Sequence, residues 1–199
     1  MVETETRTEV REHLHRLLDG MARAVASKGY ADTTIADIVR EASVSRRTFY
    51  QHFSTKAECL IALYEAASRN ALKVLRDSID PQQEWQTQVE RALTAYLGCM
   101  AQNPVLMRTL FIEILGLGTE GLAARRRVNR QIADFMLSVV NREQGHRRTT
   151  PLSPGMAMAV VGGINELILQ YIEQDRVARL PELVEPSSQL LRAVIETGA

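Results

Sequence analysis

The sequence predicts an all-α protein of about nine helices, in which a three-helix N-terminal module (residues 1–55) precedes a larger helical domain (residues 56–199). Three observations support this fold class. Apolar residues recur at helical spacing along almost the whole chain. Capping residues, Pro and Gly mark the ends of the periodic segments. No run of alternating apolar and polar residues is typical of a β-strand.

The first periodic segment closes at Gly29-Tyr30 and carries one apolar face. Residues 1–8 are polar and acidic and lie outside this pattern, so we expect them to be frayed. We expect the helix to pack across the two helices that follow it. Its apolar face consists of Leu14, Leu17, Leu18, Met21 and Val25.

The next stretch, TIADIVREASVSRRTFYQHFSTK (residues 34–56), is typical of a helix, a tight turn and a second helix. Thr34 is suited to cap the first of these helices, and Asp37, three residues later, completes a capping box. Residues 41–44 are too few for anything but a sharp turn. Ser45 then caps a helix from Arg46 to about Phe53, with Phe49 as its core anchor.

The outer face of that second helix is basic, because residues 42–57 include no acidic side chain. Arg, Gln and Thr side chains on a short helix suit base edges in the major groove of DNA. Hydroxyl, imidazole and ammonium groups beside them suit phosphates. A helical hairpin with a solvated basic face is the alternative. The expected base-reading residues are Arg46, Arg47, Thr48 and Gln51, and the expected phosphate contacts are Thr34, Ser45, Tyr50, His52 and Lys56.

A second capping box, Thr55 with Glu58, starts the larger domain. Its first helix should join the N-terminal module to the rest of the chain. Gly and Pro then divide the remaining periodic segments, and the longest irregular stretch is residues 143–154. The expected helices span residues 56–79, 85–100, 105–115, 120–142, 156–174 and 183–197.

The helix at residues 156–174 is apolar around most of its first half, so it should be buried on more than one side. Gly162 and Gly163 each cost a helix about 1 kcal/mol relative to Ala, which favours a role in close approach of another backbone. Together with the helix at residues 183–197, this helix is expected to form a four-helix homodimer interface. A buried core helix of a monomer is the alternative.

Composition and motif content narrow the functional classes. The 24 basic and 24 acidic residues balance, so any nucleic-acid contact must rely on local charge. Two cysteines without metal spacing favour a reducing cytoplasm. No signal peptide is recognisable, and the longest apolar run, residues 155–164, is far below the ~18 residues that span a membrane. Motifs for catalysis, metal or a cofactor are lacking, so we expect no enzyme, metal or cofactor.

The string TTIADIVREASVSRRTFYQHFSTKAECL, within a match over residues 14–60, resembles the DNA-binding signature of the TetR family of transcriptional regulators. The resemblance implies a dimeric regulator, most often a repressor, that binds a palindromic operator and is released by a small-molecule effector. The sequence departs from the family pattern at Ser43, where the family usually has Gly, so a positive φ there would be mildly strained.

The resemblance also implies a pocket for an apolar or amphipathic small molecule in the larger domain. Bulky, adaptable side chains there are candidate walls, although each also suits an ordinary core position. Glu113, Asn165 and Glu166 are candidates to orient a ligand, or else to form interhelical or dimer contacts. The other candidates are Trp85, Tyr96, Met100, Met107, Phe111, Phe135, Met136 and Tyr171.

Two other functional classes remain open from the sequence. One is a ligand-binding or protein-interaction module that has kept the fold without DNA binding, which the acid-free stretch at residues 42–57 disfavours. An enzyme on a helical scaffold is the third.

Overall fold

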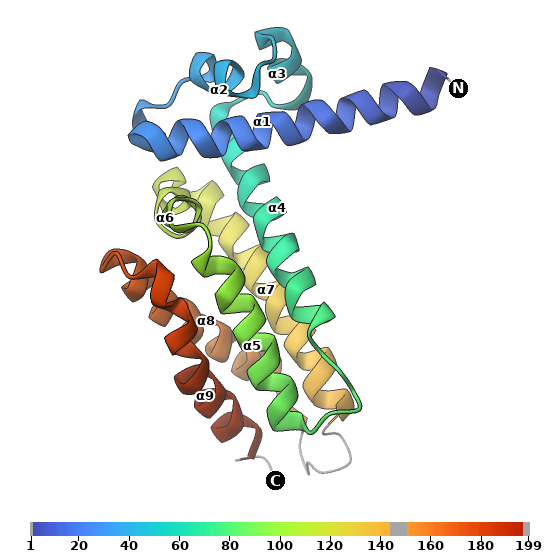
Figure 1. Ribbon diagram of the computed structural model, residues 1–199, viewed down its shortest axis with the longest axis vertical. Helices are drawn as coiled ribbons and strands as arrows, with labels where there is room; N and C mark the ends of the chain where they lie inside the picture. Colours follow the sequence, from blue (N-terminus) through green and yellow to red (C-terminus); the bar gives the residue numbers. More distant parts are fainter. Residues whose placement is uncertain (1, 144–150, 197–199) are drawn as a thin grey trace. The chain divides into compact units, whose positions relative to one another are not determined.

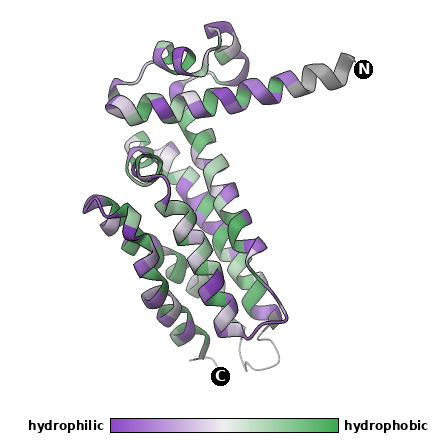
Figure 2. Cartoon of the chain, in the orientation of Figure 1, coloured by the Kyte–Doolittle hydropathy of each residue, from purple (hydrophilic) through white to green (hydrophobic). Residues whose placement is uncertain are grey.

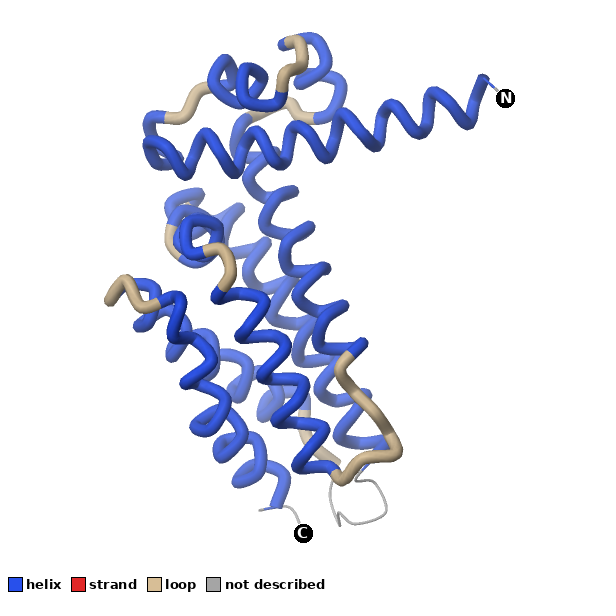
Figure 3. The backbone as a smooth tube through the Cα atoms, in the orientation of Figure 1, coloured by secondary structure: helices blue, strands red, loops and turns tan. Residues whose placement is uncertain are grey.

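The computed structural model describes residues 2–143 and 151–196, and every regular element in these ranges is helical (Figures 1 and 3). The expected all-α class is therefore confirmed, with nine α-helices and two short 3₁₀ helices in the described ranges. The chain forms two compact units. Unit 1 comprises Met1–Ala67 and Arg108–Ala124, and unit 2 comprises Ser68–Met107 and Arg125–Ala199. The boundary expected between residues 55 and 56 remains a prediction about independently folding domains.

The N-terminal part of unit 1 contains three helices and the start of a fourth: α1 (Val2–Asp32), α2 (Ile35–Ala42), α3 (Arg46–His52) and α4 (Lys56–Asp77). The expected fraying of residues 1–8 is wrong for the backbone from Val2 onward, which is helical. Near its other end α1 is interrupted at Gly29, where φ is 77° and the chain leaves the helix as expected. Figure 1 shows α2 and α3 on the same side of α1. Their shared core includes the fully buried Leu17, Met21, Ile38, Phe49 and Leu60.

Helices α1 and α2 approach each other most closely at Gly20. A Cβ atom there would lie 2.7 Å from the carbonyl oxygen of Ile38 and 2.8 Å from both the Cβ and the backbone nitrogen of Ala42. Since backbone atoms cannot yield cheaply, only glycine fits at this crossing. Gly20 therefore sets the spacing between α1 and the helix that leads into the turn.

Unit 1 also contains the end of α6 (Pro104–Phe111), the 3₁₀ helix η1 (Glu113–Leu117) and the first turn of α7 (Thr119–Glu143). The single helix expected over residues 105–115 is thus divided in two. The tight 3₁₀ turn packs against α7, because a Cβ at Gly121 would lie 1.8 Å from the carbonyl oxygen of Ile114.

Unit 2 combines the C-terminal half of α4 with α5 (Trp85–Ala101), most of α7, α8 (Pro154–Glu173), η2 (Val177–Leu183) and α9 (Val184–Glu196). Helices α5 and α9 run side by side, and each carries both hydrophobic and hydrophilic residues (Figures 1 and 2). The 3₁₀ helix η2 was not predicted from the sequence. It begins after Asp175, which takes a left-handed conformation with φ of 56°. Of the loop expected at residues 143–154, residues 144–150 lie outside the described ranges.

Helix α8 is the one described helix that is long and apolar enough to cross a membrane by length and composition. One of its faces is buried within unit 2, so its apolar character has a packing explanation in that unit. The buried face consists of Ala157, Val160, Val161, Ile164, Asn165, Ile168 and Ile172.

Candidate nucleic-acid interface and effector cavity

The turn between α2 and α3 has a defined hydrogen-bonded geometry. The backbone N–H of Asp37 donates to Thr34 Oγ1 at 3.3 Å, and the Thr34 N–H donates to Asp37 Oδ2 at 3.0 Å, which forms the expected capping box. At the other end of α2, Ser43 has the anticipated positive φ, 51°, and the Val44 N–H closes the turn on Val39 O at 3.0 Å. Both ends of α2 are thus fixed.

Two arginines of α1 satisfy the carbonyl groups at the C-terminal end of α2. Arg16 Nε donates to Ala42 O at 3.0 Å, and its terminal nitrogen Nη2 donates to Ser43 O. Arg23 Nη2 donates to Glu41 O at 2.5 Å. Cations at a helix C-terminus also favour the helix dipole. Neither arginine was predicted from the sequence to have this role, although their seven-residue spacing places them on one side of α1.

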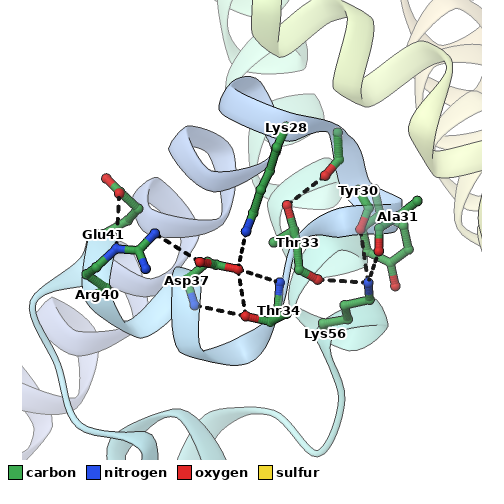
Figure 4. Close-up of polar contacts among 10 residues, drawn as sticks. Lys28, Tyr30, Ala31, Thr33, Thr34, Asp37, Arg40, Glu41 and Lys56 are labelled. Atoms are coloured by element: carbon green, nitrogen blue, oxygen red, sulfur yellow. Dashed lines mark hydrogen bonds and ion pairs between the residues drawn. The ribbon is translucent and has the colours of Figure 1, made fainter.

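A second cluster ties the end of α1 to the start of α2 through Asp37 (Figure 4). Its Oδ2 accepts from Lys28 Nζ at 2.5 Å and from Thr34 Oγ1 at 2.6 Å, and its Oδ1 accepts from Arg40 Nη2 at 2.9 Å. These contacts, with that of Lys28 first, hold the pKa of Asp37 well below its usual range. Asp37 is therefore ionised at any physiological pH.

Lys56 joins the start of α4 to the last residues of α1 and to Thr33, which follows them (Figure 4). Its Nζ donates to the carbonyl oxygens of Tyr30, Ala31 and Thr33 at 2.9, 3.1 and 2.8 Å. The ammonium also lies 4.5 Å from the centroid of the Tyr30 ring. Since an ammonium group has three donors, all three have acceptors here. The phosphate contact expected of Lys56 would require the release of at least one carbonyl.

The remaining α3 residues present a polar face. Arg46, Arg47, Tyr50 and Gln51 are exposed, while the neighbouring Phe49 is fully buried. No acidic residue lies among them, so this face is positive. The expected base-reading residues therefore lie on one short helix whose orientation is set by its buried phenylalanine.

The hydroxyl groups at the start of α3 are partly used in capping. Ser45 Oγ accepts from the Thr48 N–H at 3.0 Å and is paired with Thr48 Oγ1 at 2.9 Å. Whichever of the two hydroxyl groups donates to the other, the second one keeps a hydrogen that it can donate elsewhere. The hydroxyl of Thr34, by contrast, already donates to Asp37, so a phosphate contact through it would compete with the capping box.

His52 is half-buried at the end of α3. Burial, reinforced by the nearby His13, lowers the pKa of His52 below its ordinary value. Its imidazole is therefore neutral at pH 7. It can donate one hydrogen bond to a phosphate but does not act there as a fixed cation.

Unit 2 contains an apolar, partly open cavity of about 100 Å³ between α4, α5, α7, α8 and α9. Five of the expected pocket residues line it: Trp85, Tyr96, Phe135, Met136 and Asn165. Aliphatic side chains that the sequence analysis had not singled out form the rest of the wall, because a ligand cavity and a core share the same periodicity. They are Leu75, Ile79, Val89, Ala92, Leu93, Ile132, Val139, Val140, Val161, Ile164 and Leu191.

Two polar side chains of the cavity wall, Asn165 and Trp85, differ in whether they have hydrogen-bond partners. Asn165 Nδ2 donates to Asn129 Oδ1 at 3.0 Å. The indole Nε1 of Trp85 is buried and has no hydrogen-bond partner among the described residues. A buried unpaired donor is costly, so this N–H is an exception in the packing of the cavity wall.

The other expected pocket residues lie away from this cavity. Phe111 and Glu113 belong to unit 1, and Glu166 is exposed on α8. Tyr171 donates its hydroxyl to Glu182 Oε2 at 3.2 Å. The remaining two, Met100 and Met107, are buried but are not among the residues that line the cavity.

The N-terminal helices match a known protein family in sequence, and the chain as a whole is similar to named regulators. Residues 17–63 match the sequence model described as bacterial regulatory proteins, tetR family. The HTH-type transcriptional regulator TtgR of Pseudomonas putida is 28% identical over 171 residues, which cover 80% of this chain and 69% of that protein. The probable HTH-type transcriptional regulator ArpR of Pseudomonas putida is 27% identical with the same coverage.

Solved structures show the same fold at lower identity. The fatty acid degradation regulator FadR from Bacillus halodurans superposes with a TM-score of 0.74 at 18% identity, over 90% of this chain and 94% of that one. The regulator FadR from Bacillus subtilis, in complex with stearoyl-CoA, gives 0.72 at 17% identity, over 89% and 96%. Each of these relatives is named as a regulator. The helix-turn-helix geometry and the matched family model identify residues 17–63 as the DNA-binding module of the bacterial regulatory proteins, tetR family, and the rest of the chain shares the fold of these regulators.

Proposed function

We propose that this protein is a cytoplasmic homodimeric repressor that binds a palindromic operator and is released by a small apolar or amphipathic effector. The observation that carries the proposal is the exposed, acid-free face of α3, which a capped turn and a buried Phe49 hold outward. A rigid presentation of this kind suits insertion into the major groove.

The roles on this face follow from side-chain chemistry. Arg46 and Arg47 suit guanine, Gln51 suits adenine, and the methyl group of Thr48 suits thymine. The phosphate contacts would come from Tyr50, His52 and the free hydroxyl hydrogen of the Ser45–Thr48 pair, with Thr34 contributing only if its capping bond is shared. We assign Lys56 chiefly to holding the turn.

Dimerisation would use α8 and α9. The outer face of α8 exposes Met156, with 46% of its surface accessible, and carries exposed Gly162 and Gly163. On α9, Leu190 and Val194 are half-exposed and available to a partner. Leu191 and Ile195 of the same helix are buried within the protomer and are not available to a partner. A two-fold dimer would place two α3 helices on matching half-sites.

An effector role is supported by the apolar cavity of unit 2, whose wall includes the bulky side chains of Trp85, Tyr96 and Phe135. One structural neighbour binds stearoyl-CoA, an amphipathic molecule, which agrees with a cavity of this character. We propose that occupancy shifts the protein away from its DNA-binding state.

Selection of bound duplexes from a random DNA pool, repeated at two salt concentrations, tests the DNA-binding proposal. A palindrome whose affinity falls steeply with salt is the expected result. Arg47→Ala should then lose about 1–3 kcal/mol of binding free energy and relax the preference at one position per half-site. Glu9→Ala, an exposed α1 residue outside the acid-free stretch, is the matched control and should keep the same preference.

Two results would contradict this assignment. Wild-type affinity of the Arg47 variant for a true operator would remove the base-reading role of α3. Failure to recover any sequence, with and without cell extract as a source of corepressor, would favour an interaction module that does not bind DNA.

A further inference from the structure

A second concavity lies on the surface of unit 2, between α4 and α7. It is an open groove of about 750 Å³ with a mixed polar and apolar wall, in contrast to the apolar cavity of the same unit. Its residues are Arg69, Leu72 and Arg76 of α4 and Gln131, Asp134, Phe135 and Ser138 of α7. The proposed function does not account for a polar groove at this place.

The groove has a positive balance of charge. Arg69 and Arg76 are two helical turns apart, so both guanidinium groups project from one side of α4. The wall contains one carboxylate, that of Asp134. Within residues 2–143 and 151–196, neither arginine forms an ion pair with a described side chain. Each guanidinium carries a planar set of donors that suits a carboxylate or a phosphate.

The groove and the cavity share one side chain. Phe135 lines both, and the guanidinium of Arg76 lies 5.7 Å from the centroid of its ring. Phe135 is therefore part of the wall between the groove and the cavity. Arg76 places a cation over that same ring.

Resting on the proposed effector role, we propose that the effector is an anionic amphiphile. Its carboxylate or phosphate group binds Arg69 and Arg76 in the groove, and its alkyl chain passes Phe135 into the cavity toward Trp85. The two recesses are the two halves of one site, and the anionic head, rather than the apolar tail alone, sets specificity. Asp134 weakens the binding of an anion by like-charge repulsion.

Trp85 is the only tryptophan in the chain and lines the cavity, so its fluorescence reports occupancy directly. Three probes with the same alkyl chain separate head from tail: octanoate, octyl phosphate and octan-1-ol, titrated into the full-length protein near neutral pH. One or both anions should bind about tenfold more tightly than the alcohol, as expected for added charge-assisted hydrogen bonds. The order of the two anions identifies the head group.

Arg69→Gln and Arg76→Gln should abolish this preference for an anion and leave the affinity for octan-1-ol within about twofold. Arg69→Gln is the cleaner variant, because Arg76 also contacts the Phe135 ring. Asp134→Asn should strengthen the binding of both anions. Lys73→Gln is the control: Lys73 lies on the same helix but outside the groove, where it pairs with Asp77.

Equal affinity of the wild type for the alcohol and both anions would overturn the two-part site while leaving the cavity as an apolar effector site. The same conclusion follows if the arginine variants weaken all three probes equally. Suppose that no probe alters Trp85 fluorescence while the protein still selects a DNA sequence. This result would refute both the anionic amphiphile and the role of the cavity as an effector site, but it would leave the DNA-binding proposal intact.

Discussion

Lys56 provides the sharpest test of how the DNA-binding unit is held together, because two roles for it predict opposite results. If its ammonium mainly holds the turn between α1 and α2, removing the charge should lower stability. If it mainly contacts a phosphate, removal should lower the salt dependence of DNA binding. Lys56→Met separates the two, since methionine keeps an apolar stem of similar length without the charge.

The expected loss of stability follows from the contacts. The bonds to Tyr30 and Thr33 are partly buried and each contribute about 1 kcal/mol, while the exposed bond to Ala31 contributes little. The contact with the Tyr30 ring adds about 0.5–1 kcal/mol. The free energy of unfolding should therefore fall by about 2–3 kcal/mol, which for a chain of this size lowers Tm by roughly 5–10 °C.

Thermal unfolding and DNA titrations at several salt concentrations measure both quantities on one variant. We expect Lys56→Met to keep the wild-type slope of log affinity against log salt. Arg47→Met is the matched comparison: Arg47 is exposed and assigned to base reading, so Tm should stay unchanged while the preference at one position per half-site relaxes. Unchanged Tm in Lys56→Met, together with a slope reduced by about 0.9, would refute the reasoning.

Three further substitutions test the packing and the turn. Gly20→Ala should lower the free energy of unfolding by about 1–3 kcal/mol despite the better helix propensity of alanine, because the new Cβ meets backbone atoms. Gly98→Ala is the control, because a Cβ there meets nothing within 4 Å, and calorimetry should show it to be neutral or stabilising. Ser43→Gly should stabilise by about 0.5–1 kcal/mol by relieving the positive φ, and unchanged Tm would show that serine is not strained there. Because its pKa is lowered on folding, Asp37 contributes its full stabilisation above the unfolded-state pKa and loses it as pH falls through the folded-state pKa. Asp37→Asn should therefore make the free energy of unfolding depend less on pH below about pH 5. An unchanged pH profile of stability would contradict this.

Local patterns in the sequence predicted the DNA-binding helices well. The Thr34–Asp37 capping box, the Ser45 cap and the buried Phe49 depend on residues three or four apart, and such spacings are visible in a single sequence. The possibility of a positive φ at Ser43 came from the family resemblance, because the family usually has Gly at this position. Helix ends were less predictable, as the split at η1 and the unexpected η2 show.

The cavity was only partly predictable, for a different reason. Trp85, Tyr96, Phe135 and Met136 were chosen for size and softness, and these properties do not distinguish a cavity wall from a packed core. Which apolar side chains leave a void between them depends on how five helices pack. Glu166 illustrates the limit, since one step along α8 from Asn165 moves it from the wall to the exposed surface.

The sequence by itself determined the all-helical class, the place of the helix-turn-helix and the side chains of its basic face, because each depends on short spacings along the chain. Only the tertiary structure decided what holds that face in position. Arg16 and Arg23 reach the end of α2, and Lys56 reaches the carbonyls after α1, across 18 to 27 residues of chain. Hydrogen bonds over such separations are made by the packing of helices, which no local pattern of residues records.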